Sequence, residues 1–254
     1  MRVLSDQVAL DRPGEDLLYD LFMPATGSNV PAVICIHGGG WISGDRSEMH
    51  PVAQRFAENG FAAICAGYRL APLHPYPAAI EDCQNLVVHL RQNASNLGIL
   101  TNSIAAFGNS AGGFLAACLA VRDRPAEFSS RVDAAVDICG LTDLTEPQKQ
   151  HPDISWDFIN QFMGVKYEAD SAKWIEASPV YHVDELTAPM LIMHGDEDDI
   201  VWIEQSKKLF TALQLHGVPS RFEILSGEGH SFSIQAFERI LNESYEFLRE
   251  CFSK

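Results

Sequence analysis

Short apolar runs alternate along the chain with segments whose apolar residues recur at helical spacing. This alternation is the pattern of a largely parallel sheet whose two faces are covered by helices. We therefore predict buried strands in six segments, namely AVICIHGGG (32–40), FAAICAGYRL (61–70), SIAAFGNS (103–110), AAVDICGL (134–141), PMLIMHGDED (189–198) and the alternating SRFEIL (220–225).

Helical spacing is clearest in three segments between and after these runs. The first has apolar residues at 80, 83, 87 and 90, and the second at 209, 210 and 213. The last predicts an amphipathic helix at the C-terminal end, with an apolar face formed by Phe237, Ile240, Leu241, Phe247, Leu248 and Cys251. The predicted fold class is α/β, with a mostly parallel central sheet flanked by helices.

One region, from about Thr142 to Val183, breaks this alternation. It is rich in polar residues and prolines, yet it also carries several large aromatic residues. We expect a short, cap-like insertion that folds over the edge of the sheet. Trp156, Ile159 and Met163 share one helix face, which leaves two readings: these side chains pack against the main body, or some of them wall a substrate pocket.

Composition narrows the possibilities further. The 254 residues are 46% hydrophobic and 20% charged, which suits one core and predicts a single domain over residues 1–254. The formal net charge of −16 argues against nucleic acid or an anionic membrane as a partner. A small neutral molecule or a carbohydrate ester fits better as substrate. The oligomeric state stays open.

Two features bear on location and redox chemistry. The first residues lack the apolar core of a signal peptide, and no stretch approaches the roughly 20 apolar residues of a membrane span, so we expect a cytoplasmic protein unless a leader has been removed. The six cysteines lie in hydrophobic runs without CxxC spacing. We therefore expect buried free thiols, with no metal site and no cofactor.

The motif GNSAGG, from Gly108 to Gly113, follows a predicted strand and opens a segment of small residues. This is the context that a G-x-S-x-G nucleophile elbow requires, because a serine in a sharp strand-to-helix turn tolerates only glycine two positions to either side. A serine hydroxyl also needs a base and a group that orients the base. The alternative is an ordinary tight turn between a strand and a helix.

Both partners follow downstream, in the order nucleophile, acid, histidine. Four acidic residues, Asp196 to Asp199, come directly after a predicted strand, and His230 lies in the glycine-flanked loop GEGHSF. If Ser110 attacks a carbonyl, backbone N–H groups must stabilise the resulting oxyanion. We expect Ala111 to supply one of them and the HGGGW segment, through Gly39 and Gly40, to supply the rest, although the donors among its three glycines stay open.

Six motifs together, HGGGW, YRLAP, GNSAGG, SPVYHV, HGDEDDIV and GEGHSF, resemble those of the α/β-hydrolase carboxylesterases from about residue 15 onward. With only 36 residues before His37, we expect no N-terminal cap of the hormone-sensitive-lipase type. The compact form looks most like the bifunctional acetyl xylan and feruloyl esterases and related carbohydrate acetylesterases. The resemblance implies the α/β-hydrolase fold, with the insertion after strand 6 of that fold.

The resemblance also implies roles for single residues. The family pattern HG-x-x-D-x-x-V, laid on His194, selects Asp198 as the acid, with Asp196 as the alternative. Tyr68 and Arg69 are interpreted as structural. Trp41 has two open roles, shaping the acyl pocket as a substrate-binding residue or simply packing.

Three functions remain in competition. The first is a serine ester hydrolase that removes short acyl groups, acetyl or feruloyl, from carbohydrate or small esters through an acyl-enzyme, with Ser110, Asp198 and His230 as the catalytic triad. Kynurenine formamidases share HGG-x-W and the triad, and a general carboxylesterase has the same site. A non-catalytic binding protein of the same fold is disfavoured, because such proteins tend to lose a triad member and this chain has a candidate for each.

Overall fold

The structure is a computed structural model and describes residues 1–25, 27–124 and 127–253. Eight strands of these residues form one sheet in the order β1-β2-β4-β3-β5-β6-β7-β8. From β4 through β3 to β8, neighbours pair in parallel, whereas β2 is antiparallel to both β1 and β4. The strands are β1 (Arg2–Leu10), β2 (Leu17–Met23), β3 (Val30–Ile36), β4 (Ala62–Ala66), β5 (Ile99–Asn109), β6 (Ala134–Ile138), β7 (Met190–Gly195) and β8 (Ser220–Leu225).

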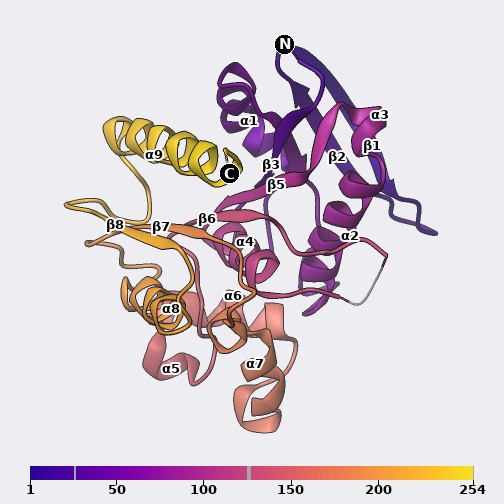
Figure 1. The fold of residues 1–254 in the computed structure, drawn as a ribbon. Coiled ribbons are helices and arrows are strands. Elements are labelled where there is room, and N and C mark those ends of the chain that lie inside the picture. Colours follow the sequence, from indigo (N-terminus) through magenta and orange to yellow (C-terminus); the bar gives the residue numbers. More distant parts are fainter. Residues whose placement is uncertain (26, 125–126, 254) are drawn as a thin grey trace.

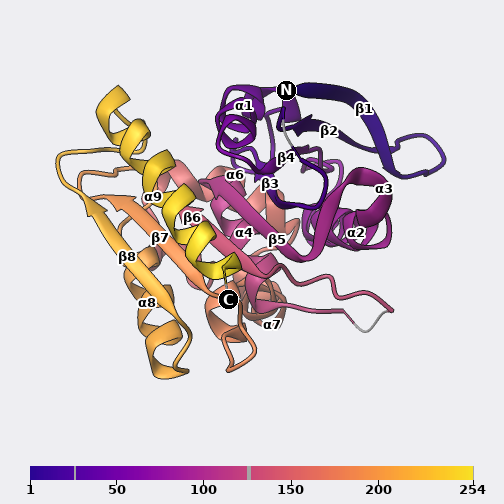
Figure 2. The same ribbon diagram turned by 45° about the horizontal axis from the view of Figure 1, so that its top comes forward.

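Helices cover both faces of this sheet (Figures 1 and 2). On one face, α1 (His50–Glu58) and α9 (Ile234–Phe252) contribute Phe56 and Leu248 to one core cluster. On the other face, α2 (Ala78–Gln92), α4 (Ala111–Val121) and α8 (Glu204–Leu215) contribute Leu86, Leu115 and Leu209 to a second cluster. The short α3 (Ala94–Leu97) and the 3-10 helix η1 (Arg46–Met49) lie in the connections.

The predicted fold class is confirmed. All six predicted strands and all three predicted helices are present, and the central strands β4 and β6 are buried along their whole length. The antiparallel pair β1 and β2 was not predicted. In β1 most residues are exposed, so this strand lacks the continuous apolar run on which the other predictions rest.

Residues 142–183 form the predicted insertion after β6. It comprises α5 (Pro147–Gln150), α6 (Asp153–Met163), η2 (Tyr167–Ala169), α7 (Ser171–Ala177) and η3 (Pro179–His182). On α6, Ile159 and Met163 are fully buried and pack into the core, while Trp156 is only half-buried. Of the two interpretations left open for this helix face, packing against the main body therefore applies to Ile159 and Met163, whereas Trp156 can still line a pocket.

Cysteine burial agrees with the sequence analysis. Cys35, Cys65, Cys83, Cys118 and Cys139 are buried free thiols, and Cys251 is half-buried on α9. None of the helices in the described ranges combines the length and the apolar character needed to cross a membrane. The cytoplasmic location stays a prediction.

A buried carboxyl group lies behind the turn that joins β5 to α4. Asp137 on β6 is fully buried, and its Oδ1 accepts a hydrogen bond of 2.9 Å from the N–H of Gly140. Its Oδ2 has no hydrogen-bond partner among the described residues. Burial raises the pKa of Asp137 to about 7, against the opposing effects of His194 and the Gly140 N–H. The native state therefore holds a proton here that the unfolded chain releases near pH 4.

This difference predicts how stability depends on pH. Because the native state binds more protons between about pH 4 and pH 7, the stability contributed by Asp137 falls as the pH rises through that window. An amide is neutral throughout and can still accept from Gly140. Between about pH 5 and pH 8, the free energy of unfolding of Asp137→Asn should therefore rise relative to that of the wild type by about 2 kcal/mol or more, measured by urea unfolding. A difference that does not change with pH contradicts the assignment.

Candidate active site

Ser110 occupies the sharp turn between β5 and α4, and its backbone has φ of 56° and ψ of −121°. A Cβ atom at Gly108 would lie 2.3 Å from the carbonyl carbon of Gly112, and one at Gly112 would lie 2.1 Å from the carbonyl oxygen of Ile36. Only glycine fits at these two positions. The predicted elbow is thus formed, with the steric requirement that the sequence analysis gave for it.

The loops after β5, β7 and β8 bring the three predicted triad residues together. The Oγ of Ser110 lies 3.0 Å from the Nε2 of His230, and the Nδ1 of His230 lies 2.8 Å from the Oδ2 of Asp198. Because a carboxylate only accepts, Nδ1 carries the proton and Nε2 is left to accept from the serine hydroxyl. This is the tautomer that a general base needs.

The four acidic residues differ in their surroundings. Asp198 is buried against His230, whereas Asp196, the alternative acid, is exposed and accepts a 2.7 Å hydrogen bond from the N–H of Gly227. Glu197 and Asp199 are exposed as well. The geometry therefore favours Asp198 as the residue that orients the histidine.

Asp198 is held as a carboxylate by several donors. Its Oδ1 accepts from the N–H groups of Ile200 (2.9 Å) and Val201 (2.8 Å), and its Oδ2 faces both His230 and His194. Burial alone raises the pKa of Asp198, but the hydrogen bonds from His194, His230 and the Val201 N–H outweigh it and lower that pKa well below its usual range. The group is therefore a carboxylate at neutral pH.

The sequence analysis assigned no role to His194. It used this residue only as the first position of the HG-x-x-D-x-x-V pattern. The side chain is fully buried, and its Nε2 lies 2.8 Å from the carbonyl oxygen of Val201 and 3.3 Å from the Oδ2 of Asp198. Its Nδ1 lies 2.7 Å from the Oγ of Ser206. Since a carbonyl only accepts, Nε2 must carry a proton, and this N–H also faces the Oδ2 of Asp198, the oxygen that His230 contacts.

The glycine loop after β3 lies against the nucleophile. Gly39 and Gly40 have φ of 92° and 58°, and a Cβ at Gly39 would lie 2.2 Å from the carbonyl oxygen of Ser43. Within the described part of the chain, the backbone N–H groups of Gly39, Gly40 and Ala111 donate to no other group. Such unused N–H groups beside a nucleophile can stabilise an oxyanion, as the sequence analysis expected.

Tyr68 holds the glycine loop in place. Its ring stacks on that of His37 at 4.2 Å, and its hydroxyl donates to the carbonyl oxygens of Gly38 (3.0 Å) and His37 (3.1 Å). The neighbouring Arg69 forms two hydrogen bonds of 2.9 Å to the buried carboxylate of Asp82. Both contacts agree with the structural roles expected for Tyr68 and Arg69. Tyr68, however, lies directly under the predicted oxyanion loop, which the sequence analysis had not foreseen.

Trp41 is fully buried. Its ring stacks on Phe162 at 4.2 Å and meets Phe114 edge-on at 5.0 Å, so it joins the glycine loop to α6 and α4. Of the two roles left open for this residue, the geometry favours packing. A substrate cannot reach the ring without displacing the insertion.

An apolar cavity of about 420 Å³ lies beside the glycine loop and the residue before the nucleophile. Its lining consists of the backbone of Gly38 and Gly39, the polar residues His37, Glu48 and Asn109, and apolar side chains that include Phe107, Ile138, Phe232 and Phe237. The triad residues border it but are not part of its lining. The sequence analysis named Phe237 only as part of the C-terminal helix face and gave none of these apolar residues a place at the site. Phe232 follows His230 by two positions, so the GEGHSF loop supplies both the candidate base and part of the cavity wall.

One group of side chains has the spacing of metal ligands. Potential ligand atoms of Cys139, Asp198 and His230 all lie within 4.8 Å of one another. Burial raises the pKa of Cys139 well above its usual range, so the thiol stays protonated, and Asp198 and His230 are engaged with each other. The arrangement is that of a hydrogen-bonded triad with a thiol packed against it.

Comparison with known proteins adds three findings. The sequence profile of the BD-FAE family matches residues 19–213. Esterase LipQ of Mycobacterium tuberculosis (strain ATCC 25618 / H37Rv) is 29% identical over 239 residues, which are 89% of this chain and 56% of LipQ. The chain spans about half the length of the curated relatives it matches.

Two solved structures cover almost the whole chain. A truncated form of a carbohydrate esterase from gut microbiota superposes with a TM-score of 0.86 and 23% identity, over 100% of this chain and 97% of that one, which confirms the fold. Esterase 2 of Thermogutta terrifontis, solved with propionate bound, superposes with a TM-score of 0.83 and 25% identity, over 97% of this chain and 94% of that one.

The position of His194 can be tested with a matched pair of substitutions. The amide nitrogen of a glutamine can take the place of Nε2, whereas an asparagine reaches only the position of Nδ1. His194→Gln should therefore keep the hydrogen bond toward Asp198 and remain within a few-fold of wild-type kcat. His194→Asn should lower kcat about tenfold or more, because a donor to a buried carboxylate is lost. Both are measured with p-nitrophenyl acetate.

The control is the melting temperature of each variant, since both substitutions disturb the same packed position. If both variants lose kcat equally while they stay folded, the donor at Nε2 is unimportant and the assigned contact does not position the acid.

Proposed function

The chain belongs to the BD-FAE family of α/β-hydrolase esterases, and from that premise we propose that it is a serine carboxylic-ester hydrolase acting on short acyl esters of carbohydrates and small alcohols. The observation that carries the proposal is the unbroken line of contacts from Ser110 through His230 to Asp198, at 3.0 Å and 2.8 Å. These side chains are separated by up to 120 positions in the sequence and serve no evident packing purpose together.

The mechanism follows from this geometry. The Oγ of Ser110 attacks the ester carbonyl while the Nε2 of His230 takes its proton, and the oxyanion forms beside the N–H groups of Gly39, Gly40 and Ala111. His230 then returns the proton to the leaving alcohol, which gives an acyl-enzyme on Ser110. A water molecule, deprotonated by His230, releases the acid and restores the serine.

Asp198 remains ionised throughout this cycle, because its lowered pKa keeps it a carboxylate. Its role is to hold the Nδ1 proton of His230 and to stabilise the imidazolium that forms in each step. No cofactor takes part in this scheme.

The apolar cavity beside the glycine loop supports a short or aromatic acyl group. Its volume of about 420 Å³ lies in the lower part of the range usual for ligand sites, and its phenylalanine lining suits a small alkyl chain or a single ring. Esterase 2 of Thermogutta terrifontis was solved with propionate and with butyrate, two short acids. For this chain, the carbohydrate alcohol is an inference from the motifs shared with acetyl xylan and feruloyl esterases.

A panel of substrates tests this function. We expect kcat/KM on p-nitrophenyl acetate and butyrate to exceed that on the octanoate, because a long chain at an open site leaves methylenes in solvent and each of these forgoes about 0.8 kcal/mol of burial. Acetate release from acetylated xylan and turnover of methyl ferulate should both be measurable. Ser110→Ala is the control and should abolish all of these activities while leaving the melting temperature nearly unchanged.

Two results would contradict the proposed substrate preference. A rise in kcat/KM from acetate to octanoate would indicate a lipase-like acyl site. Turnover of N-formylkynurenine far above that of every ester would favour the formamidase alternative.

A further inference from the structure

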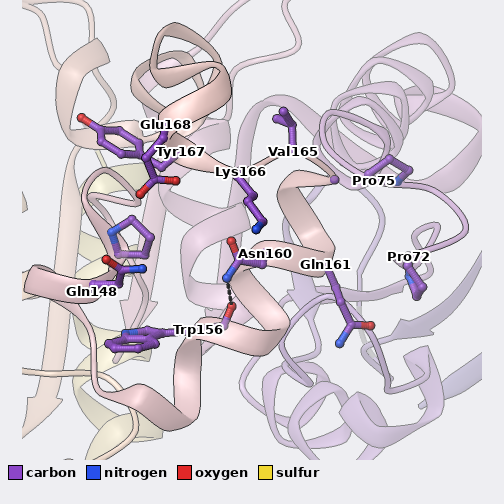
Figure 3. Close-up of a pocket in the computed structure, with 12 residues that line it drawn as sticks. Pro72, Pro75, Gln148, Trp156, Asn160, Gln161, Val165, Lys166, Tyr167 and Glu168 are labelled. Carbon is purple, nitrogen blue, oxygen red and sulfur yellow. Dashed lines mark hydrogen bonds between the residues drawn. The ribbon is translucent and has the colours of Figure 1, made fainter.

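A second, larger cavity, the outer cavity, lies between the insertion and the loop after β4. Its volume is about 900 Å³, and it is bounded by α6, by the residues on either side of α6 and by the prolines at 72 and 75 (Figure 3). Trp156 and Asn160 on α6 face Gln148, Lys166 and Tyr167 across it. No residue of the triad lines this cavity.

Helix α6 separates the cavity from the catalytic loops. Phe158 packs against the glycine loop, since a Cβ at Gly40 would lie 2.9 Å from its ring, whereas Trp156, two positions earlier, lines the cavity. Residues two apart point in nearly opposite directions from a helix. Trp156 in the cavity and Phe158 at the oxyanion loop thus point to different sides of one helix, whose diameter with side chains is about 10–12 Å.

The same helix is tied to the acid loop. The Oγ of Ser155 donates to the carbonyl oxygen of Ile200, two residues after Asp198, at 2.5 Å. The wall of the outer cavity is therefore fixed relative to the triad, and a ligand that occupies one site is held at a defined distance from the other.

The aromatic side chains of the cavity are held in place. The Nε1 of Trp156 donates to the carbonyl oxygen of His151 at 2.9 Å. Tyr167 meets Trp174 edge-on at 5.9 Å, and the Nε1 of Trp174 in turn donates to the carbonyl oxygen of Val165 at 3.1 Å. Two rigid, half-exposed rings lose little conformational entropy when a ligand lies against them.

The polar side chains between the rings are suited to a neutral, hydroxyl-rich ligand. Gln148, Asn160 and Gln161 offer amide groups, which both donate and accept. The charges of Lys166 and Glu168 cancel, and the net charge of −16 on the whole chain disfavours anions. Aromatic faces with amides beside them match the apolar C–H faces and equatorial hydroxyls of a sugar ring better than they match a lipid or a phosphate.

We propose that this outer cavity binds unacylated sugar units of an oligosaccharide whose ester group lies at Ser110. The proposal rests on the ester hydrolase activity proposed above and adds to it a second contact with the carbohydrate. Because the two sites are a helix width apart, a single acylated sugar cannot occupy both, whereas a chain of several units can. The enzyme then prefers acylated oligosaccharides to acylated monosaccharides.

The first experiment measures sugar binding alone, in a protein that cannot hydrolyse esters. Titration of the Ser110→Ala protein with unacetylated xylohexaose, followed by isothermal calorimetry, should show saturable binding. Trp156→Ala should weaken it about tenfold, because one aromatic contact is lost. Ile154→Ala, on the same helix but outside the cavity and 62% exposed, is the matched control and should leave the affinity unchanged.

Turnover is tested second, in the protein with Ser110 intact. Trp156→Ala should lower the ratio of kcat/KM on acetylated xylo-oligosaccharides to kcat/KM on p-nitrophenyl acetate about tenfold, mainly through KM. If Trp156→Ala does not fold, Asn160→Ala, an exposed change that removes one amide, should lower the same ratio several-fold.

The outcomes separate the two proposals. Xylohexaose that fails to bind, or binds equally well to Trp156→Ala, overturns the outer sugar site even if esters are hydrolysed. Xylohexaose that binds through Trp156 in a protein without esterase activity supports the sugar site and overturns the proposed reaction.

Discussion

The whole candidate site depends on how closely helix α4 approaches strand β3. With a Cβ at Gly112, the helix would collide with the carbonyl oxygen of Ile36 at 2.1 Å. This approach forces Ser110 into left-handed backbone geometry, which costs about 1–3 kcal/mol for a residue with a side chain. The hydroxyl is thereby lifted out of the sheet, and the unused N–H of Ala111 lies beside the glycine loop. The strain is sustained because α4 is buried along its whole length and β5 is buried from Ser103 to Gly108.

Around this turn, polar groups are paired in a way that leaves a single side-chain base for chemistry. The carboxylate of Asp198 receives two backbone N–H groups and two histidines, so its charge is compensated inside the protein. The hydroxyl of Tyr68 contacts the carbonyl oxygens of His37 and Gly38, and the N–H groups of Gly39 and Gly40 have no acceptor among the described residues. The group that remains available is Nε2 of His230, directed at the serine. Preorganisation of this kind requires no rearrangement when charge develops.

Much of this architecture could be predicted from the sequence, because its main determinants are local. Continuous apolar runs predicted the strands at 32–36, 62–66 and 190–195. The order of GNSAGG, HGDEDDIV and GEGHSF predicted that a serine, one of four acids and a histidine meet, and the family resemblance selected Asp198 among the acids. The glycines at 108 and 112 were predicted for the correct steric reason.

Other features could not be read from the sequence because they depend on contacts between distant segments. The burial of Trp41 depends on Phe162, which comes from the insertion. The position of His194 depends on the turn after β7, which returns the chain so that its side chain meets Asp198 four residues later. Strand β1 lies at the edge of the sheet beside β2, where most of its residues are exposed, so it needs no continuous apolar run. Trp156 shares a helix face with Ile159 and Met163, and only the tertiary structure shows that it faces a cavity while they face the core.

The central claim is that Ser110 is made a nucleophile by the contacts of this turn, and covalent trapping tests it most directly. The native protein would be treated with a fluorophosphonate ester, followed by intact mass spectrometry and peptide mapping, alongside residual hydrolysis of p-nitrophenyl acetate. The account predicts one adduct per chain, located on Ser110, that forms in step with the loss of activity and is absent from His230→Ala. Loss of activity with the adduct on another residue, or full activity in a protein labelled at Ser110, would contradict it.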